Sequence, residues 1–238
     1  MTAPADDRGI AKLLLRATRT AALATIDRVA GGPLTTLVSL GTDYSGAPLM
    51  LFSQLSHHTK NLALDPRASL LLSTRAERGD PLNRPRLTLS GRILPFQDVR
   101  ARARFIRQNP KSRLYASFAD FGIFRMEVET VHFNGGFARA AAFAPEDLMT
   151  DVSGAEGLID AEEALLAHVN AAEGGAEARL ERHLKNDAAR RWRARSLDPE
   201  GLDLASGAAS GRVVFDAPAS SPATWLRALE LSNGMQKP

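Results

Sequence analysis

Residues 49–74, LMLFSQLSHHTKNLALDPRASLLLST, contain two apolar runs separated by a short polar segment. The runs Leu49–Gln54 and Ala68–Thr74 are short and bounded by polar residues, which is typical of β-strands. His57–Leu64 fits one or two helical turns, and Asp65-Pro66 ends it because proline disfavours helix both at its own position and at the residue before it. The stretch predicts a strand, a short helix and a second strand.

Similar short apolar runs continue the pattern on both sides of this stretch. Turn chemistry at Gly31-Gly32-Pro33 and at Tyr44–Pro48 separates consecutive runs and indicates an antiparallel meander. Further strands are predicted at Thr20–Asp27, Leu34–Leu40, Arg86–Phe96 and Phe121–Phe133, and helices at Asp6–Thr18 and Asp98–Gln108. Six or more short strands with small helices between them predict a closed or partly open β-barrel.

The composition changes after Phe143. Ala144–Gly157 is acidic and contains proline, glycine and serine, so we expect a linker there. Beyond it, helices are predicted at Asp160–Asn170, Glu177–Asp187 and from Ser221-Pro222, and strands at Arg191–Leu197, Gly201–Ala205 and Gly211–Phe215. This half is predicted to be a small α+β layer.

The composition excludes several classes of protein. With 238 residues, of which 44% are hydrophobic and 24% charged, the chain has an ordinary globular composition. No apolar run approaches the roughly 18 residues of a membrane span, and acidic residues precede any hydrophobic stretch at the start, so we expect a cytoplasmic protein that uses no membrane. The absence of cysteine excludes disulfides, thiolate metal sites and cysteine nucleophiles.

The charge is divided unevenly between the two halves. Residues 1–144 hold 20 lysines and arginines against 11 acidic residues, whereas residues 145–238 hold 10 against 16. The basic half suits an anionic ligand. Its most basic segment, Asp98–Gln108, is better explained as a solvated helix face than as a nucleic-acid contact, because few aromatic residues accompany the arginines.

The familiar catalytic signatures are missing, so no catalytic residue and no metal ligand is assigned. The most informative polar cluster is His57-His58, with Ser53 before it and Thr59 after it. The first N–H groups of a helix lack partners and can receive an anion. Because no carboxylate lies close by in the sequence, the cluster suits a phosphate better than a metal, with a plain capping turn as the alternative reading.

Several segments in order resemble a known family. They are SQLSHHTKNL (53–62), DPRASLL (65–71), RLTLSG (86–91), Asp120-Phe121 and GGFARA (135–140). Together they resemble the FMN-binding split-barrel superfamily of pyridoxamine 5′-phosphate oxidase, in particular its haem-utilisation (HugZ/HutZ-like) branch. EEALLAHVN (162–170) is similar to the accessory domain of that branch, so the resemblance covers nearly the whole chain.

The resemblance implies an α+β protein with an antiparallel six-stranded split β-barrel at 1–144 and a small α+β accessory domain at 158–238. It implies a homodimer with FMN bound at the subunit interface. The residues that it places around FMN are Thr36 with its neighbours Thr35 and Leu37, Phe52, Ser53, Ser56, His57, His58 and Arg86, and the polar cluster adds Thr59.

Two departures from the family pattern matter. An Arg-Lys pair of the oxidase is replaced by His57-His58, so phosphate affinity should be lower and should weaken as pH rises. In the second half His168 and Asn170 match the family's His-x-Asn, but Ala172 and Glu173 replace an Asp-His pair.

The leading hypothesis is an FMN-binding, oxidoreductase-like protein of unknown substrate, in which the flavin would carry the redox chemistry. One alternative is a haem-binding or haem-degrading protein, for which His57, His58 and His132 are the candidate iron ligands within the barrel. The other is a non-catalytic scaffold that binds a protein partner. The sequence leaves these three open.

Overall fold

The computed structural model describes residues 7–73, 80–136, 139–171, 191–207 and 209–237. The chain divides into two compact units, Met1–Met149 and Thr150–Pro238, which are described separately. The predicted helix Glu177–Asp187 lies outside the described residues. The assignment of a cofactor domain to 1–144 and an accessory domain to 158–238 stays a prediction.

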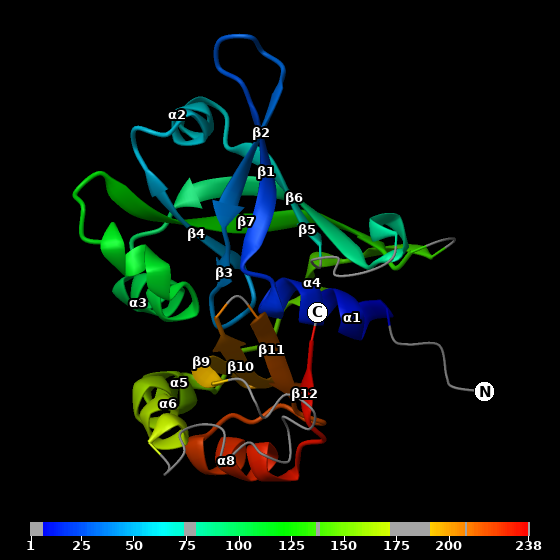
Figure 1. Ribbon diagram of the computed structural model, residues 1–238, viewed down its shortest axis with the longest axis vertical. Helices are drawn as coiled ribbons and strands as arrows, with labels where there is room; N and C mark the ends of the chain where they lie inside the picture. The colour runs from blue at the N-terminus through cyan, green and yellow to red at the C-terminus, as the bar shows by residue number, and fades with distance from the viewer. Residues whose placement is uncertain (1–6, 74–79, 137–138, 172–190, 208, 238) are drawn as a thin grey trace. The chain divides into compact units, whose positions relative to one another are not determined.

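The first unit is built on one curled antiparallel sheet (Figure 1). Its strands are β1 (Thr20–Ile26), β2 (Pro33–Ser39), β3 (Gly41–Thr42), β4 (Pro48–Ser53), β5 (Arg67–Ser73), β6 (Arg86–Pro95), β7 (Phe121–Asn134) and β8 (Ala140–Phe143). The order is β2-β1-β5-β6-β7-β4-β3, with β8 paired to β7. We expected six strands and find eight, because β3 and β8 are too short to show an alternating pattern in the sequence.

Strict alternation gives the sheet an inner and an outer face. Along β1 the buried residues are Ala21, Leu23 and Thr25, while the residues between them are only partly buried. Leu23 is paired with Leu70 on β5, and Leu70 with Leu89 on β6, so leucines from three strands form the centre of the core. Burial of such side chains contributes about 1.5–3 kcal/mol each, which drives the curl around them.

A β-bulge between Ser90 and Gly91 changes the register of β6 against β7. Ser90 is paired with Thr130 but Gly91 with Val128, so Glu129 is the extra residue. A Cβ at position 91 would lie 2.0 Å from the Glu127 carbonyl oxygen, which explains the glycine. Val131 and Phe133 are buried on one side of the bulge, and Phe124 and Met126 on the other.

Helices and short turns cover the rest of the first unit. They are α1 (Asp7–Ala17), α2 (His57–Leu64), α3 (Val99–Gln108) and α4 (Pro145–Leu148), with 3-10 turns η1 (Pro81–Asn83) and η2 (Pro110–Leu114). The prediction of a linker at Ala144–Gly157 is wrong in part. α4 forms within this segment, and its Leu148 is fully buried in the barrel core.

The basic face expected on α3 is only partly solvated. Arg104 is fully buried, donates to the Thr42 carbonyl oxygen at 3.0 Å and lies over the Tyr44 ring at 4.4 Å. Arg102 donates to the Phe121 carbonyl oxygen at 3.1 Å. These guanidinium groups hold the α3 side of the sheet together, so they are structural.

The second unit has its own small sheet and core. It contains α5 (Glu156–Asp160), α6 (Glu162–Asn170), β9 (Arg193–Asp198), β10 (Gly201–Ser206), β11 (Ala209–Val214), α8 (Pro222–Leu231) and β12 (Met235–Gln236). The strand order is β12-β11-β10-β9, so a fourth strand joins the three that we expected. Trp192 and Trp225 are fully buried in the core of this unit.

The same unit contains a buried ion network on three strands. Arg212 donates to Asp198 Oδ1 at 2.6 Å and to Asp203 Oδ1 at 2.8 Å. Asp203 also accepts from the Ser196 hydroxyl at 2.7 Å, and Asp198 from the Glu200 N–H at 2.9 Å. Burial alone would lower the pKa of Arg212, but the two carboxylates raise it, so the guanidinium stays charged.

Among the described helices of the chain, none is long and apolar enough to span a membrane.

Candidate functional site

The first turn of α2 joins two strands that lie far apart in the order of the sheet. His58 Nδ1 is 3.3 Å from the Thr36 Oγ1 on β2, and the His58 ring lies 4.5 Å from the Phe52 ring on β4, centre to centre. Thr36 is paired with the buried Leu23, so it faces the inside of the curl. The curl therefore brings together three of the residues that the sequence singled out.

Two polar atoms at this turn are buried without a hydrogen-bond partner in the described part of the chain. They are Nε2 of His58 and Oγ1 of Thr59, whose residue is only 7% exposed. The N-cap residue Ser56 makes no side-chain cap, and the first main-chain bond of the helix runs from Lys60 N–H to Ser56 O at 3.2 Å. Because the first N–H groups of a helix have no intrahelical acceptor, this turn offers hydrogen-bond donors without matching acceptors.

His58 is neutral near pH 7. Burial, and then the charge of His57, lower its pKa below the ordinary value of 6.5. A neutral imidazole has one donor and one acceptor nitrogen. An anion at Nε2 would favour the protonated ring, which has two donors, so proton and anion would bind together.

His57 points to a different partner. Its Nε2 lies 2.7 Å from Asp27 Oδ2, and this side chain is half exposed. The N–H groups of Ala30 and Val29, and then His57, lower the pKa of Asp27, so the carboxylate is ionised. The sequence reading had found no carboxylate near the histidines. That reading was wrong, because the β1–β2 hairpin folds back onto α2.

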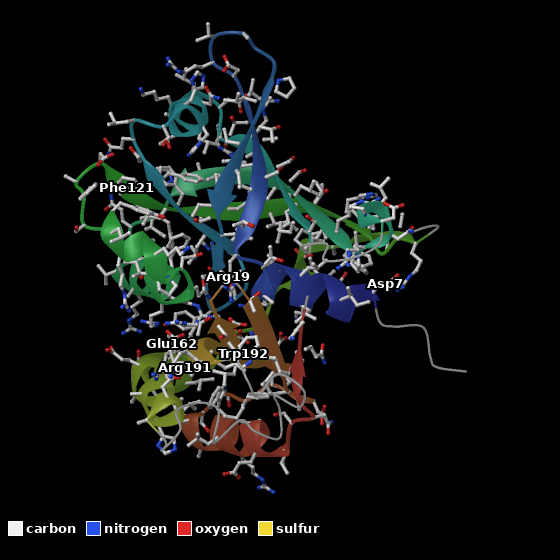
Figure 2. All side chains as sticks on the ribbon, in the orientation of Figure 1. Asp7, Arg19, Phe121, Glu162, Arg191 and Trp192 are labelled. Carbon is white, nitrogen blue, oxygen red and sulfur yellow. The ribbon has the colours of Figure 1, made fainter. Side chains whose placement is uncertain are left out.

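Ser53 meets a second carboxylate. Its hydroxyl donates to Asp120 Oδ2 at 2.5 Å and accepts from the Leu55 N–H at 3.1 Å. Ser53 is paired with Phe121, the first residue of β7, which is labelled in Figure 2. Ser53 thus lies at the α2 end of β4 but is already committed to an acidic partner.

Asn61 fixes α2 to the hairpin. It is fully buried, donates to the Thr25 hydroxyl at 3.0 Å and accepts from the Arg28 N–H at 3.1 Å. Sequence reasoning missed Asn61 and Asp27. A polar residue on the predicted helix and an acid at the end of the strand before Gly31-Gly32 were the available signals.

Arg86 is not brought to this cluster within one chain. It lies on β6, three strands from β2 in the order of the sheet, and is paired with Ser73 and Asn134. Its neighbour Leu87 is buried in the core, so Arg86 lies on the outer face, where it donates to the Leu82 carbonyl oxygen at 2.7 Å.

His132 also lies on the outer face. It is exposed, its neighbours Val131 and Phe133 are buried, and it has no hydrogen-bond or ionic partner among the residues that the structure describes. The described residues contain no group of three or more histidine or acidic side chains that could hold a metal ion. Within the described part of the chain, the α2 turn thus holds buried polar atoms without partners, and His132 is an exposed imidazole without one.

Comparison with known proteins matches residues 3–149 to the family model described as CREG, beta-barrel. Over 96% of this chain and 95% of the other, the structure resembles the protein Atu2129 from Agrobacterium tumefaciens, of unknown function, with 37% identity and a TM-score of 0.84. A heme binding protein from Mycobacterium smegmatis matches over 96% of both chains with 26% identity and a TM-score of 0.58.

The chain is also 30% identical over 115 residues to the chloroplastic heme oxygenase HOZ of Arabidopsis thaliana. The match covers 46% of this chain and 34% of HOZ, so the chain spans about a third of the length of that relative.

Proposed function

Because the chain belongs to the CREG β-barrel family, we propose that it is a cofactor-binding protein and that its ligand is haem. The observation that carries this proposal is the match over 96% of both chains to a heme binding protein at 26% identity. The 30% identity to part of a plant heme oxygenase supports the same ligand. The expected membership of the haem-utilisation branch is part of this proposal.

The residues present fit the chemical demands of haem. Haem needs an axial ligand for iron and cations for its carboxylates. The first unit holds histidines 57, 58 and 132 and an excess of arginine, while cysteine is absent from the whole chain. When bound, the iron would supply oxygen and one-electron chemistry, and the chain would supply orientation and charge.

The test is a titration of the purified full chain with hemin, followed by visible absorption. We expect a saturable Soret shift with a sharp equivalence point. The control is the same titration after the chain has been unfolded in urea, where the shift should be absent. A linear, non-saturating change in the folded chain, equal to that in buffer, would contradict haem binding.

FMN is the second candidate, and the first turn of α2 favours it. Unsatisfied donors at His58 and Thr59, next to free helix N–H groups, suit a phosphate monoester. Thr36 and Phe52 contact the same turn, so they would flank the flavin, as the family resemblance implies. This reading is that of a flavin-dependent, oxidoreductase-like protein.

Flavin fluorescence separates the two candidates. If FMN occupies the α2 turn, FMN fluorescence should be quenched on binding, and affinity should tighten from pH 8 to pH 6 as His58 takes up a proton. His58→Ala should remove the pH dependence. Riboflavin lacks the phosphate, so its affinity should be the same at pH 8 and pH 6. No quenching at high micromolar protein would exclude FMN, and failure of both ligands would favour the scaffold reading.

We further propose that the protein is a homodimer that uses the outer face of the sheet. Leu37 is 78% exposed and Leu71 is 42% exposed on that face, so a second copy would remove apolar surface from water. Light scattering coupled to size exclusion should give twice the chain mass of 25.6 kDa. A Leu37→Glu variant should give the chain mass itself, and a wild-type chain that is monomeric would contradict the proposal.

A further inference from the structure

The outer face of the sheet carries a continuous row of cross-strand neighbours. Leu37 is paired with Ala22, Ala22 with Leu71, Leu71 with Thr88 and Thr88 with His132. Because paired residues point to the same side of a sheet, all five side chains share one face. Apart from the imidazole, the row contains no titratable group.

The neighbouring row has the same character. It runs through Thr35, Ala24, Ser69, Ser90 and Thr130, and the Ser69 and Ser90 hydroxyls bond to each other at 2.7 Å. These hydroxyls are small, so the two rows form an uncharged and partly apolar strip on the curled sheet. Charge returns at its border, where Arg86 lies on β6 two residues from Thr88 and the exposed Glu129 lies next to Thr130 on β7.

The three barrel histidines differ in their availability to a metal. His57 has Nε2 in contact with Asp27, and His58 has Nε2 buried against the α2 turn. His132 is exposed, has no described partner and stands at the end of this uncharged strip.

We propose that His132 is the axial iron ligand, with haem lying over the outer face of β6, β7 and β8 and Arg86 pairing with a propionate at its edge. This inference rests on the proposed haem binding and names the residues that would perform it. It also separates the haem site from the α2 turn, which faces the inside of the curl.

The geometry of a sheet suits this arrangement. Side chains stand roughly perpendicular to a sheet, so a ring ligated by His132 would lie parallel to it. With strands about 4.8 Å apart, β5 lies two spacings from β7 and beyond the edge of the macrocycle, so a porphyrin centred over β7 would extend over Thr88 on β6 and leave Leu71 to the proposed dimer contact. On the other side β8 presents Ala142, the cross-strand neighbour of His132, which leaves room for the macrocycle.

Arg86 is placed to meet the rim of such a ring. Its partner on β7 is Asn134, two residues from His132, so the two side chains are diagonal neighbours about 7–8 Å apart at the backbone. The Arg86 side chain can span that gap, and a guanidinium–carboxylate hydrogen bond is charge-assisted and strong. Replacing its present bond to the Leu82 carbonyl oxygen with one to a carboxylate would add charge pairing.

The test compares hemin with metal-free protoporphyrin IX on the full-length wild-type chain and two variants, His132→Ala and the control His168→Ala in the second unit. We expect His132→Ala to weaken hemin binding tenfold or more, to lose the electron paramagnetic resonance signature of a histidine ligand and to regain it with added imidazole. Protoporphyrin IX should bind wild type and variant alike, because it makes no iron–nitrogen bond. His168→Ala should resemble wild type.

Each failure has its own signature. A wild-type chain that does not bind hemin overturns both the proposed function and this inference. If His132→Ala binds haem with the wild-type affinity and spectrum, only the inference is overturned. The same holds if hemin binding is lost in His58→Ala and kept in His132→Ala. For Arg86→Gln, weaker binding of hemin but unchanged binding of its dimethyl ester is expected, and equal loss for both ligands would refute the propionate contact. Far-ultraviolet circular dichroism of each variant checks the fold. His132 is exposed and Arg86 is only partly buried, so neither substitution should disrupt the core.

Discussion

The α2 turn of the first unit and the Arg212 network of the second unit both place polar groups in the interior, but they treat them differently. In the network, the Arg212 guanidinium donates to two carboxylates, and these carboxylates also accept from a hydroxyl and a main-chain N–H, all within 3 Å. At α2, the Nε2 of His58 and the hydroxyl of Thr59 are buried with no described partner. Unsatisfied buried polar groups are costly and rare, so those that persist call for an explanation.

The difference separates a structural cluster from a receptive one. A network whose charges are paired by the chain's own side chains specifies packing and needs no ligand, although Oδ2 of Asp198 makes no hydrogen bond in the described part of the chain. A turn whose buried donors have no partner in the chain gains those bonds from a ligand or from water. Experiments on stability and on ligand binding should therefore give opposite results at the two places.

The largest effect is expected for Arg212→Met. Removing the guanidinium leaves Asp198 and Asp203 as uncompensated buried charges, which lowers the free energy of unfolding by about 3–5 kcal/mol. Both tryptophans are buried in this unit, so urea unfolding followed by tryptophan fluorescence measures the loss directly.

Arg193→Met is the matched control for that variant. Arg193 lies on β9 of the same sheet but is exposed, so its loss should change the free energy of unfolding by no more than about 0.5 kcal/mol. Equal stability of the two variants would show that the network contributes nothing. Cofactor binding to the first unit should be unaffected in both.

A smaller pair of effects, with opposite signs, is expected for two buried threonines. Thr25→Val removes the acceptor of the Asn61 amide and should lower the free energy of unfolding by about 1–3 kcal/mol. Thr59→Val removes a hydroxyl that has no partner among the described residues, so it should be neutral or stabilising by up to about 1 kcal/mol. Amide hydrogen exchange of β1 measures the change in the free energy of unfolding for both variants.

The same pair distinguishes receptive from structural hydroxyls. Thr59→Val should reduce the stabilisation that inorganic phosphate or FMN gives to the first unit, whereas Thr25→Val should leave it unchanged. If Thr59→Val destabilises as much as Thr25→Val, the Thr59 hydroxyl has a structural partner and the comparison fails.

The smallest effect concerns pH. The folded chain holds the pKa of His58 below 6.5, so as pH falls through this value the unfolded chain binds a proton that the folded chain resists. Stability should therefore fall from pH 7 to pH 5, by no more than about 1.4 kcal/mol for each unit of pKa shift. His58→Gln should be less sensitive over the same range, as measured by thermal midpoints.

Added phosphate provides the control for the pH effect. An anion at the α2 turn favours protonated His58, so 100 mM phosphate should reduce the acid loss in wild type and not in His58→Gln. The same acid loss with phosphate and with chloride would mean that no anion binds at this turn.

The local pattern of the sequence was sufficient for most elements. The prediction His57–Leu64 coincides with α2, because Asp65-Pro66 ends the helix chemically. Short apolar runs bounded by turn residues also identified β1, β2, β5 and β6 to within a few residues. The coarse α+β class is therefore confirmed, whereas the strand count is not, since two-residue and four-residue strands form only when the neighbouring edge pairs with them.

The candidate site was less predictable, because its partners come from distant segments. Asp27 reaches His57 across 30 positions, and Asp120 reaches Ser53 across 67. A pattern read along the chain contains no information on how a curl closes. The buried Arg104 was missed for the same reason, since only the approach of the Tyr44 loop removes it from water.

The bulge at Gly91 has a consequence for insertions and deletions in this family. Glu129 switches β7 from even-numbered to odd-numbered core residues, so its deletion would turn Phe124 and Met126 towards solvent while Val131 and Phe133 stayed inside. Length changes should therefore be rare among relatives at this position and at the glycine opposite it. A sequence alignment that places a gap within β7 would misalign every residue on one side of that gap. The residue equivalent to His132 in a relative could then be misidentified.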